Sequence, residues 1–115
     1  MSEKLLQITP EEMTETVREQ LKLIYDPELP VDIYNLGLIY EINCRKDEIT
    51  RLNKCDIVMT LTSATCSMSE TIVQMVESIP NRVEGLIDLK VEIVFDPPWD
   101  QNQMSDEAKL QMGFL

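Results

Sequence analysis

The length, composition and charge of the chain already limit its class. It has 115 residues, 43% of them hydrophobic and 27% charged, which is typical of one soluble globular domain with a modest core. The formal net charge of −11 argues against a surface for nucleic acid or anionic membrane, because either would need a basic patch. The absence of histidine excludes histidine-based catalytic triads and histidine metal ligands.

The N-terminus and the cysteines bear on the compartment. Residues 1–10 contain no continuous apolar segment of the kind found in signal peptides, and no apolar run approaches transmembrane length. The three cysteines are odd in number and have no framework spacing, which favours reduced thiols over disulfides. We therefore expect a cytoplasmic protein that binds no membrane.

The first part of the chain predicts a lead-in followed by a helix. Residues 1–8 are expected to be flexible, and residues 9–115 to form a single domain. Thr9 is predicted to cap a helix in which Glu12 completes a capping box. Four apolar residues recur on one face of this helix: Met13, Val17, Leu21 and Ile24. The helix should pack on the core through that face and end near Tyr25, before a proline-rich stretch.

Two strands are expected next. Apolar residues alternate from Leu36 to Cys44 and again from Cys55 to Thr62, with a polar connection between the two runs. Gly37 is expected to supply either a positive φ or a close backbone approach. Cys44 and Cys55 share the apolar side of their strands and flank the connection. We expect two reduced core cysteines, with a cross-strand disulfide or a metal pair as the alternatives.

The rest of the chain predicts a helix, a strand and a last helix. Apolar residues at helical spacing indicate a helix over residues 68–79, which Pro80 ends. Residues 87–95 have apolar side chains at every odd position, the clearest strand pattern in the sequence, with that side facing inward. A short final helix is expected to be capped by Ser105 and to end at Gly113.

This order predicts an α+β fold, a single two-layer α-β-β-α-β-α domain with a small three-stranded mixed sheet and helices on one face. The first two strands should be antiparallel, and the second and third parallel through a right-handed helical crossover. We expect the first strand to lie between the other two. The C-terminal ends of the second and third strands and the start of the first then share one rim of the sheet.

Polar and aromatic residues gather in the loops of that rim. Loops beyond the carboxyl ends of strands are where α/β proteins usually bind ligands. The candidate site residues are Asp26, Glu28, Asp32, Thr62, Thr65, Cys66, Asp96 and Trp99. Each also has a structural interpretation, because aspartate before proline suits a turn and tryptophan can cover the edge of a core. Their joint placement favours a functional site.

Cys66 is the candidate with the most distinctive chemistry. Ser67 and Glu70 match a capping box, so the thiol is expected just outside a helix N-terminus. Unpaired N–H groups and the helix dipole stabilise a thiolate there, and a thiolate attacks disulfides and binds soft metals. The alternative is a small buried hydrophobic side chain.

Three stretches of the sequence resemble the SufT-like family of iron–sulfur maturation factors. They are residues 26–40 (DPELPVDIYNLGLIY), residues 59–66 (MTLTSATC) and residues 95–108, which begin FDPPW and end MSDEA. The same domain occurs in PaaD of phenylacetate degradation and fused to some Mrp/ApbC-type P-loop ATPases. Members commonly have prolines two before and one after the cysteine, where this chain has Ala64 and Ser67.

The resemblance implies a small domain without enzymatic turnover that assists the assembly of iron–sulfur clusters or their delivery to client proteins. It puts the family's reactive cysteine at Cys66 and its acids at Asp26 and Asp96. It implies no tightly bound cofactor, although a cluster or iron could bind transiently to Cys66. The implied partners are iron–sulfur assembly proteins and client apoproteins, and a homodimer is left open. A PaaD-like accessory for a phenylacetyl-CoA oxygenase and a thiol-dependent redox enzyme are the alternatives, although the latter lacks a resolving Cys-x-x-Cys pair.

Overall fold

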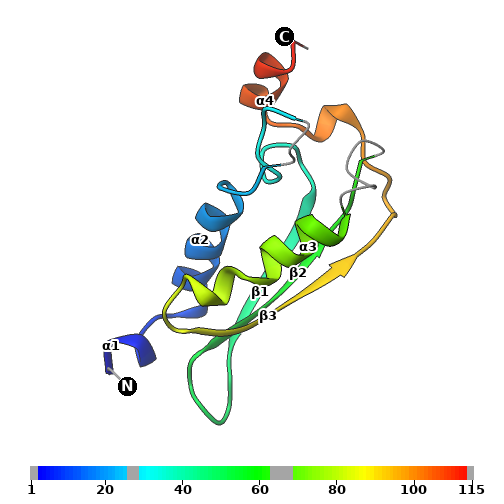
Figure 1. Ribbon diagram of the computed structural model, residues 1–115. Coiled ribbons are helices and arrows are strands. Elements are labelled where there is room, and N and C mark those ends of the chain that lie inside the picture. Colours follow the sequence, from blue (N-terminus) through cyan, green and yellow to red (C-terminus); the bar gives the residue numbers. More distant parts are fainter. Residues whose placement is uncertain (1–2, 26–28, 63–68, 114–115) are drawn as a thin grey trace.

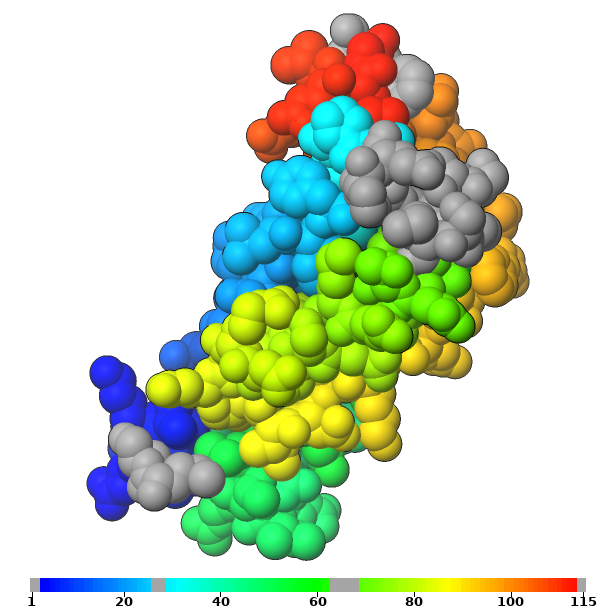
Figure 2. Space-filling model, viewed as in Figure 1, coloured from blue at the N-terminus to red at the C-terminus, as the bar shows by residue number. Residues whose placement is uncertain are grey.

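The computed structural model describes residues 3–25, 29–62 and 69–113. Its elements are α1 (Glu3–Leu6), α2 (Pro10–Leu21), β1 (Ile39–Lys46), β2 (Asn53–Met59), α3 (Ser69–Glu77), the short 3-10 helix η2 (Ile79–Asn81), β3 (Leu86–Ile93), the 3-10 helix η3 (Gln101–Gln103) and α4 (Asp106–Gln111). α2 and α3 lie on one face of the three-stranded sheet, and α4 lies at one end of the molecule (Figure 1). Figure 2, seen from the helix side, shows α2 in blue and α3 in green over the sheet. The predicted two-layer α+β fold is confirmed.

β2 lies in the centre of the sheet, between an antiparallel β1 and a parallel β3. The prediction that the first strand lies between the other two is therefore wrong. The crossover through α3 sets β3 directly beside β2, so β2 is hydrogen-bonded on both edges, and its alternate residues Cys55, Ile57 and Met59 are buried. The strand directions are as predicted, so the ends of β2 and β3 and the start of β1 still share one rim.

α2 begins as its sequence predicts. The Thr9 hydroxyl accepts a hydrogen bond from the Glu12 amide at 3.1 Å, and the Glu12 carboxylate accepts one from the Thr9 amide at 3.4 Å, which completes the capping box. The helix ends at Leu21, earlier than predicted. The chain then turns, and the Ile24 carbonyl accepts a hydrogen bond from the Ile33 amide at 2.8 Å. Ile24 stays in the core as expected.

β1 begins at Ile39 rather than at Leu36, because a turn over residues 33–37 precedes it. Gly37 ends that turn with φ +81°. A Cβ atom at this position would lie 2.3 Å from the carbonyl oxygen of Gln103. The position therefore requires both the left-handed backbone and the close approach that the sequence offered as alternatives.

β3 does not alternate as strictly as its sequence. Its register against β2 shifts next to Ile87, which leaves that side chain 42% exposed. Phe95 lies beyond the end of the strand and is 65% exposed. The prediction that both residues face the core is therefore wrong, whereas Leu89 is buried and Ile93 packs against the core as expected.

Cys44 and Cys55 form a disulfide, with their Cα atoms 4.1 Å apart. The expectation of two reduced cysteines is wrong, and the cross-strand alternative is the one observed. The cause is the register of β1 and β2, which sets the two residues directly opposite one another on the side of the sheet that faces the core. The alternation in the sequence indicated that both cysteines lie on the same side of the sheet. It could not indicate that they lie directly opposite one another.

The connection between β1 and β2 is shorter than predicted, because β1 extends to Lys46 and β2 begins at Asn53. The carboxylate of Asp47 organises it by accepting hydrogen bonds from the Thr50 amide at 2.7 Å, the Thr50 hydroxyl at 2.9 Å and the Ile49 amide at 3.1 Å. The bonds from Thr50 are the main cause that lowers the pKa of Asp47 to about 2.

α4 is capped as predicted. The Ser105 hydroxyl accepts a hydrogen bond from the Ala108 amide at 3.1 Å. Gly113 follows the helix with φ +83°. Ala108 and Met104 are buried, so this end of the chain adds to the core. No helix in the described part of the chain has the length and apolar character needed to cross a membrane.

Candidate functional site

Three stretches of the chain meet at the rim of the sheet where β2 ends. The Thr60 amide donates to the Leu38 carbonyl at 2.8 Å, which joins the end of β2 to the residue before β1. The Val94 amide donates to the Met59 carbonyl at 2.8 Å, which continues the parallel ladder past the end of β3. The rim inferred from the strand directions is therefore a continuous hydrogen-bonded edge.

Residues 94–105, the crossing segment, run from the end of β3 back to the β1 side of the rim (Figure 1, orange). The Tyr40 hydroxyl donates to the Pro97 carbonyl at 2.8 Å and accepts from the Gln103 side-chain amide at 3.1 Å. Tyr40 occupies an irregular step in the β1–β2 register. The sequence pattern did not predict this role of Tyr40 and Gln103, because regular alternation predicts no such irregularity.

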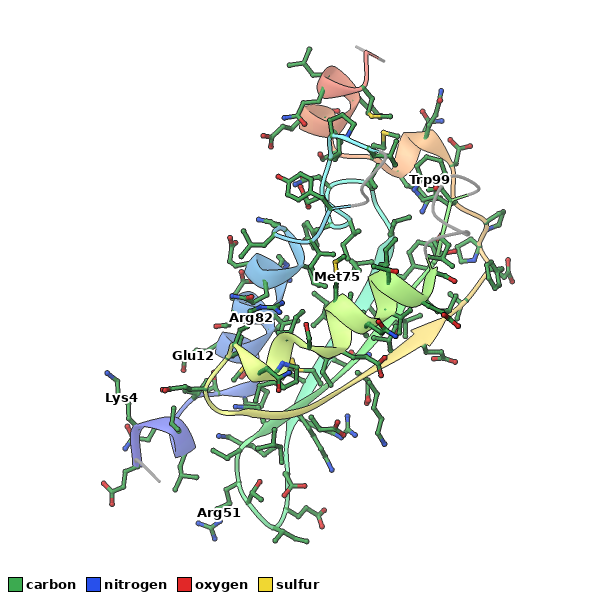
Figure 3. The ribbon with its side chains drawn as sticks, viewed as in Figure 1. Lys4, Glu12, Arg51, Met75, Arg82 and Trp99 are labelled. Atoms are coloured by element: carbon green, nitrogen blue, oxygen red, sulfur yellow. A yellow bond between two sulfur atoms is a disulfide. The ribbon has the colours of Figure 1, made fainter. Side chains whose placement is uncertain are left out.

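Trp99 anchors the crossing segment to the turn before β1. Its indole N–H donates to the Leu36 carbonyl at 2.8 Å, and its half-buried ring packs against the core (Figure 3). A hollow of about 480 Å³ lies beside it. The residues that line this hollow are Thr60, Leu61, Thr62, Phe95, Pro98 and Trp99. Two of the predicted site residues, Thr62 and Trp99, therefore share one hollow.

Thr60 is a further polar residue of this hollow that was not among the predicted site residues. Its side chain is 1% exposed. Its hydroxyl oxygen has no hydrogen-bond partner among the described residues, which is uncommon for a buried hydroxyl. A signal was present in the sequence, because Thr60 and Thr62 both interrupt the apolar run at the end of β2.

Asp32 has a structural role in the turn before β1. It is 7% exposed. Its carboxylate accepts hydrogen bonds from the Asn35 amide at 2.9 Å and from the Asn35 side-chain amide at 2.7 Å. Asp32 therefore fixes the turn that carries the Leu36 carbonyl, the acceptor for Trp99.

Asp96 lies on a different side of the rim. It is exposed and lines a second hollow, of about 670 Å³, together with Glu41, Val58 and Glu92. Thr62 and Trp99 do not line this second hollow. The structure thus brings Asp96 to the same end of the sheet but not to the same pocket.

The remaining candidates lie outside the described residues: Asp26, Glu28, Thr65 and Cys66, with Ala64 and the predicted cap Ser67. The stretch that contains Cys66 leaves the described chain at Thr62 on the rim and returns at Ser69, the first residue of α3. In the described ranges, no group of three or more aspartate, glutamate or cysteine side chains is arranged to hold a metal ion. None of the described residues that line the hollow beside Trp99 has a charged side chain.

The described residues thus define a small two-layer α+β domain with an aromatic, hydroxyl-bearing hollow at one rim of a mixed sheet. Residues 14–93 match the model of a family described as iron-sulfur cluster assembly protein. The chain belongs to this family, which confirms the resemblance seen in its sequence.

The relatives that this chain matches have nearly the same length. A protein of Porphyromonas gingivalis named "Fe-S protein maturation auxiliary factor" is 36% identical over 101 residues, 88% of this chain and 91% of that one. The factor SufT of Staphylococcus aureus is 37% identical over 91 residues, 79% of this chain and 98% of its own. The crystal structure of a domain of unknown function, DUF59, from Bacillus anthracis aligns with a TM-score of 0.79 at 36% identity, covering 92% of this chain and 96% of that one.

Proposed function

We propose that this protein is a non-enzymatic auxiliary factor that assists the assembly of iron–sulfur clusters or their delivery to client apoproteins, with Cys66 as its functional thiol. The observation that carries the proposal is similarity over almost the whole chain to relatives named as Fe-S protein maturation factors. The hollow at the rim supports it, because the stretch containing Cys66 starts directly after Thr62, which lines that hollow.

The cysteine chemistry suggests how such a factor would work. Cys44 and Cys55 are joined in a disulfide, so neither sulfur is available as a thiolate. Cys66 is the third cysteine of the sequence. Protein iron–sulfur clusters normally have four thiolate ligands. We infer that this chain contributes one ligand to a cluster or iron in transit, and that a client, an assembly protein or a second copy contributes the others.

The other predicted site residues would then support the thiol. We propose that Thr62 and Trp99 shape the contact surface beside it, since both line the hollow. Asp32 would act indirectly by holding the turn to which Trp99 is bonded. Asp26, Glu28, Thr65 and Asp96 complete the proposed set.

The experiment is complementation of a bacterial strain that lacks its own factor of this family. Wild-type protein, Cys66→Ser and the double variant Cys44→Ala/Cys55→Ala are expressed at equal levels, and the activity of an iron–sulfur dehydratase is measured. We expect Cys66→Ser to lose support of the enzyme while keeping its fold. The double variant also lacks sulfur atoms but keeps Cys66, and it should retain support wherever it remains folded. Full support by Cys66→Ser would refute the role of the thiol.

The same proteins distinguish a factor from a thiol enzyme. A redox enzyme would turn over a peroxide or a disulfide substrate through Cys66, with a measurable rate that the serine variant lacks. We expect no turnover from the wild type. Turnover that depends on Cys66 would replace the proposal of a non-enzymatic role.

A further inference from the structure

One face of the sheet is not covered by α2 and α3. In the register of the strands, its outward side chains form rows across the sheet, and the row nearest the rim is Glu41, Val58 and Glu92. Both glutamates are exposed, and Val58 between them is half-buried. An uncovered sheet face with an apolar residue at its centre is a surface on which a partner can pack.

A groove is formed where the crossing segment meets this face. Val58 and Val94 contribute apolar side chains to the hollow of about 670 Å³, and Glu41, Glu92 and Asp96 contribute carboxylates. We call these five residues the acidic groove. Among the described residues that line this hollow, the charged ones are Glu41, Glu92 and Asp96, so their combined charge is negative.

The carboxylates of the acidic groove are available to a partner. In the described part of the chain, neither Glu92 nor Asp96 has an ion pair, and Glu41 is contacted only by the Asn43 side-chain amide at 3.5 Å. The three acids do not form a metal-binding group among the described residues. Strands lie about 4.8 Å apart, so the backbones at Glu41 and Glu92 are about 10 Å apart.

The positive charges of this face lie further from the rim. The next row is Asn43, Asp56 and Lys90, and the row beyond is Arg45, Lys54 and Asp88, with Arg45 paired to Asp56. The charged residues of this face are therefore all acidic in the row at the rim and of both signs toward the hairpin. A partner with its cations at one end would find the strongest complementary charge when that end lies at the rim.

We propose that the acidic groove binds an amphipathic helix of a partner protein, whose apolar stripe packs on Val58 and Val94 and whose flanking lysines or arginines pair with Glu41 and Glu92. A helix with its side chains is about 10 Å across, which matches the separation of the two glutamates. A second copy would bring acid against acid, and nucleic acid would be repelled by the same charge. The inference deepens the proposed function, on which it rests for the partner's identity as a client or assembly protein.

The groove is held rigid by contacts outside its charged residues. Tyr40 ties Pro97 and Gln103 together, and Gln103 lies against Gly37. Pro97, Gln103, Tyr40 and Gly37 all border the groove. A wall fixed before the partner arrives reduces the entropy lost on binding.

The test uses a synthetic amphipathic peptide with a leucine stripe flanked by lysines, and a matched peptide with glutamates in place of the lysines. Each is titrated into isotope-labelled full-length protein, and amide shifts and affinity are measured by NMR. The lysine peptide should shift amides of β2, the end of β3 and the crossing segment. The double variant Glu41→Gln/Glu92→Gln, the groove variant, should bind it about tenfold more weakly, and the glutamate peptide should not bind.

The control is a second double variant, Glu11→Gln/Glu48→Gln, which makes the same change in net charge at exposed acids away from the groove. It should keep wild-type affinity for the lysine peptide. Equal weakening by both double variants, or shifts that spread over the whole surface, would show that the binding is general electrostatic attraction and would overturn the proposal. Absence of any shift at the groove would overturn it as well.

Complementation separates this inference from the proposed function. If the groove recruits the partner, the groove variant should lower support of iron–sulfur enzymes while the control variant does not. If the groove variant loses peptide binding but supports the enzymes fully, the groove has no part in maturation and the inference fails, whereas the role of Cys66 stands. Loss of support by Cys66→Ser with peptide binding intact would confirm that the two surfaces act separately.

Discussion

The two ends of the sheet are held together in different ways. At the hairpin end, the disulfide joins residues only 11 positions apart, and Asp47 binds groups two and three positions further along the chain. At the rim, the hydrogen bonds of Trp99 and Tyr40 reach partners 63 and 57 positions away. The hairpin end is therefore held by contacts between residues close in the sequence. The rim forms only when distant parts of the chain have come together.

This difference suggests where stability and function can be separated. Removing a local contact of the hairpin can lower the stability of the whole fold without changing the shape of the rim. A change at the rim acts on the contacts that position the candidate site, so it should alter partner binding together with stability. Four variants, taken from the largest expected effect to the smallest, test this separation.

The rim should be most sensitive at Gly37. Gly37→Ala combines a positive φ with a Cβ atom 2.3 Å from the Gln103 carbonyl oxygen, and we expect it to lower the free energy of unfolding by about 4 kcal/mol. Gly113→Ala is the matched control, because φ there is +83° but no atom lies within 4 Å of the added Cβ. Its cost should be about 1 kcal/mol. Equal costs in urea denaturation would show that the contact with Gln103 is not tight.

The hairpin should lose most from removal of its disulfide. The double variant Cys44→Ala/Cys55→Ala should lower the free energy of unfolding by about 3 kcal/mol, because the crosslink limits the unfolded chain. Peptide binding at the acidic groove should stay unchanged in the folded variant. A loss of that binding at temperatures where the variant is folded would contradict the separation of the two ends.

Trp99→Phe tests one bond that links the crossing segment to β1. It keeps an aromatic ring but leaves the Leu36 carbonyl without its indole donor. We therefore expect it to lower the free energy of unfolding by about 1 kcal/mol. Phe95→Leu, at an exposed position of the same segment, should cost less than half as much. Hydrogen exchange should show faster exchange at the rim amides in Trp99→Phe alone. A uniform change over the whole sheet would argue against a local role.

Asp47→Asn tests the charge at the tip of the hairpin. The pKa of Asp47 in the folded protein is about 2, below its ordinary value of 3.8. The ionised carboxylate therefore stabilises the fold fully at pH values above 3.8, and this contribution is lost as the pH falls through about 2. Wild type should be more stable than the variant at neutral pH, and the difference should vanish as pH falls through that window. A difference that does not change with pH would show that the charge is not the cause.

Much of the fold was predictable from local patterns. The capping box at Thr9, the cap at Ser105 and the apolar face of α2 are each encoded within a few residues, and each is observed. Gly37 also carried its information locally, because glycine is the residue that a left-handed turn requires. The strand directions followed from the lengths of the connections.

The predictions that were wrong concern register and the pairing of distant segments. The position of β2 in the centre depends on which strands lie side by side, and the exposure of Ile87 and the disulfide depend on which residue lies opposite which. Apolar alternation repeats every second residue and fixes neither choice. At the candidate site, the meeting of strand ends could be predicted, but the bonds of Tyr40 and Gln103 could not. They arise from an irregular step in β1 and a segment that crosses the sheet.

The crossing segment also affects when, during its synthesis, the protein can first bind a partner at the rim. The bond from Trp99 to Leu36 spans 63 positions, and a ribosome needs about 3 to 13 seconds to make that length of chain. During this interval α2, the hairpin and α3 can form, but the turn at Leu36 lacks its indole donor and the acidic groove lacks Asp96 and its wall. A partner that recognises the finished rim would therefore ignore nascent chains and bind only protein whose synthesis has passed the crossing segment.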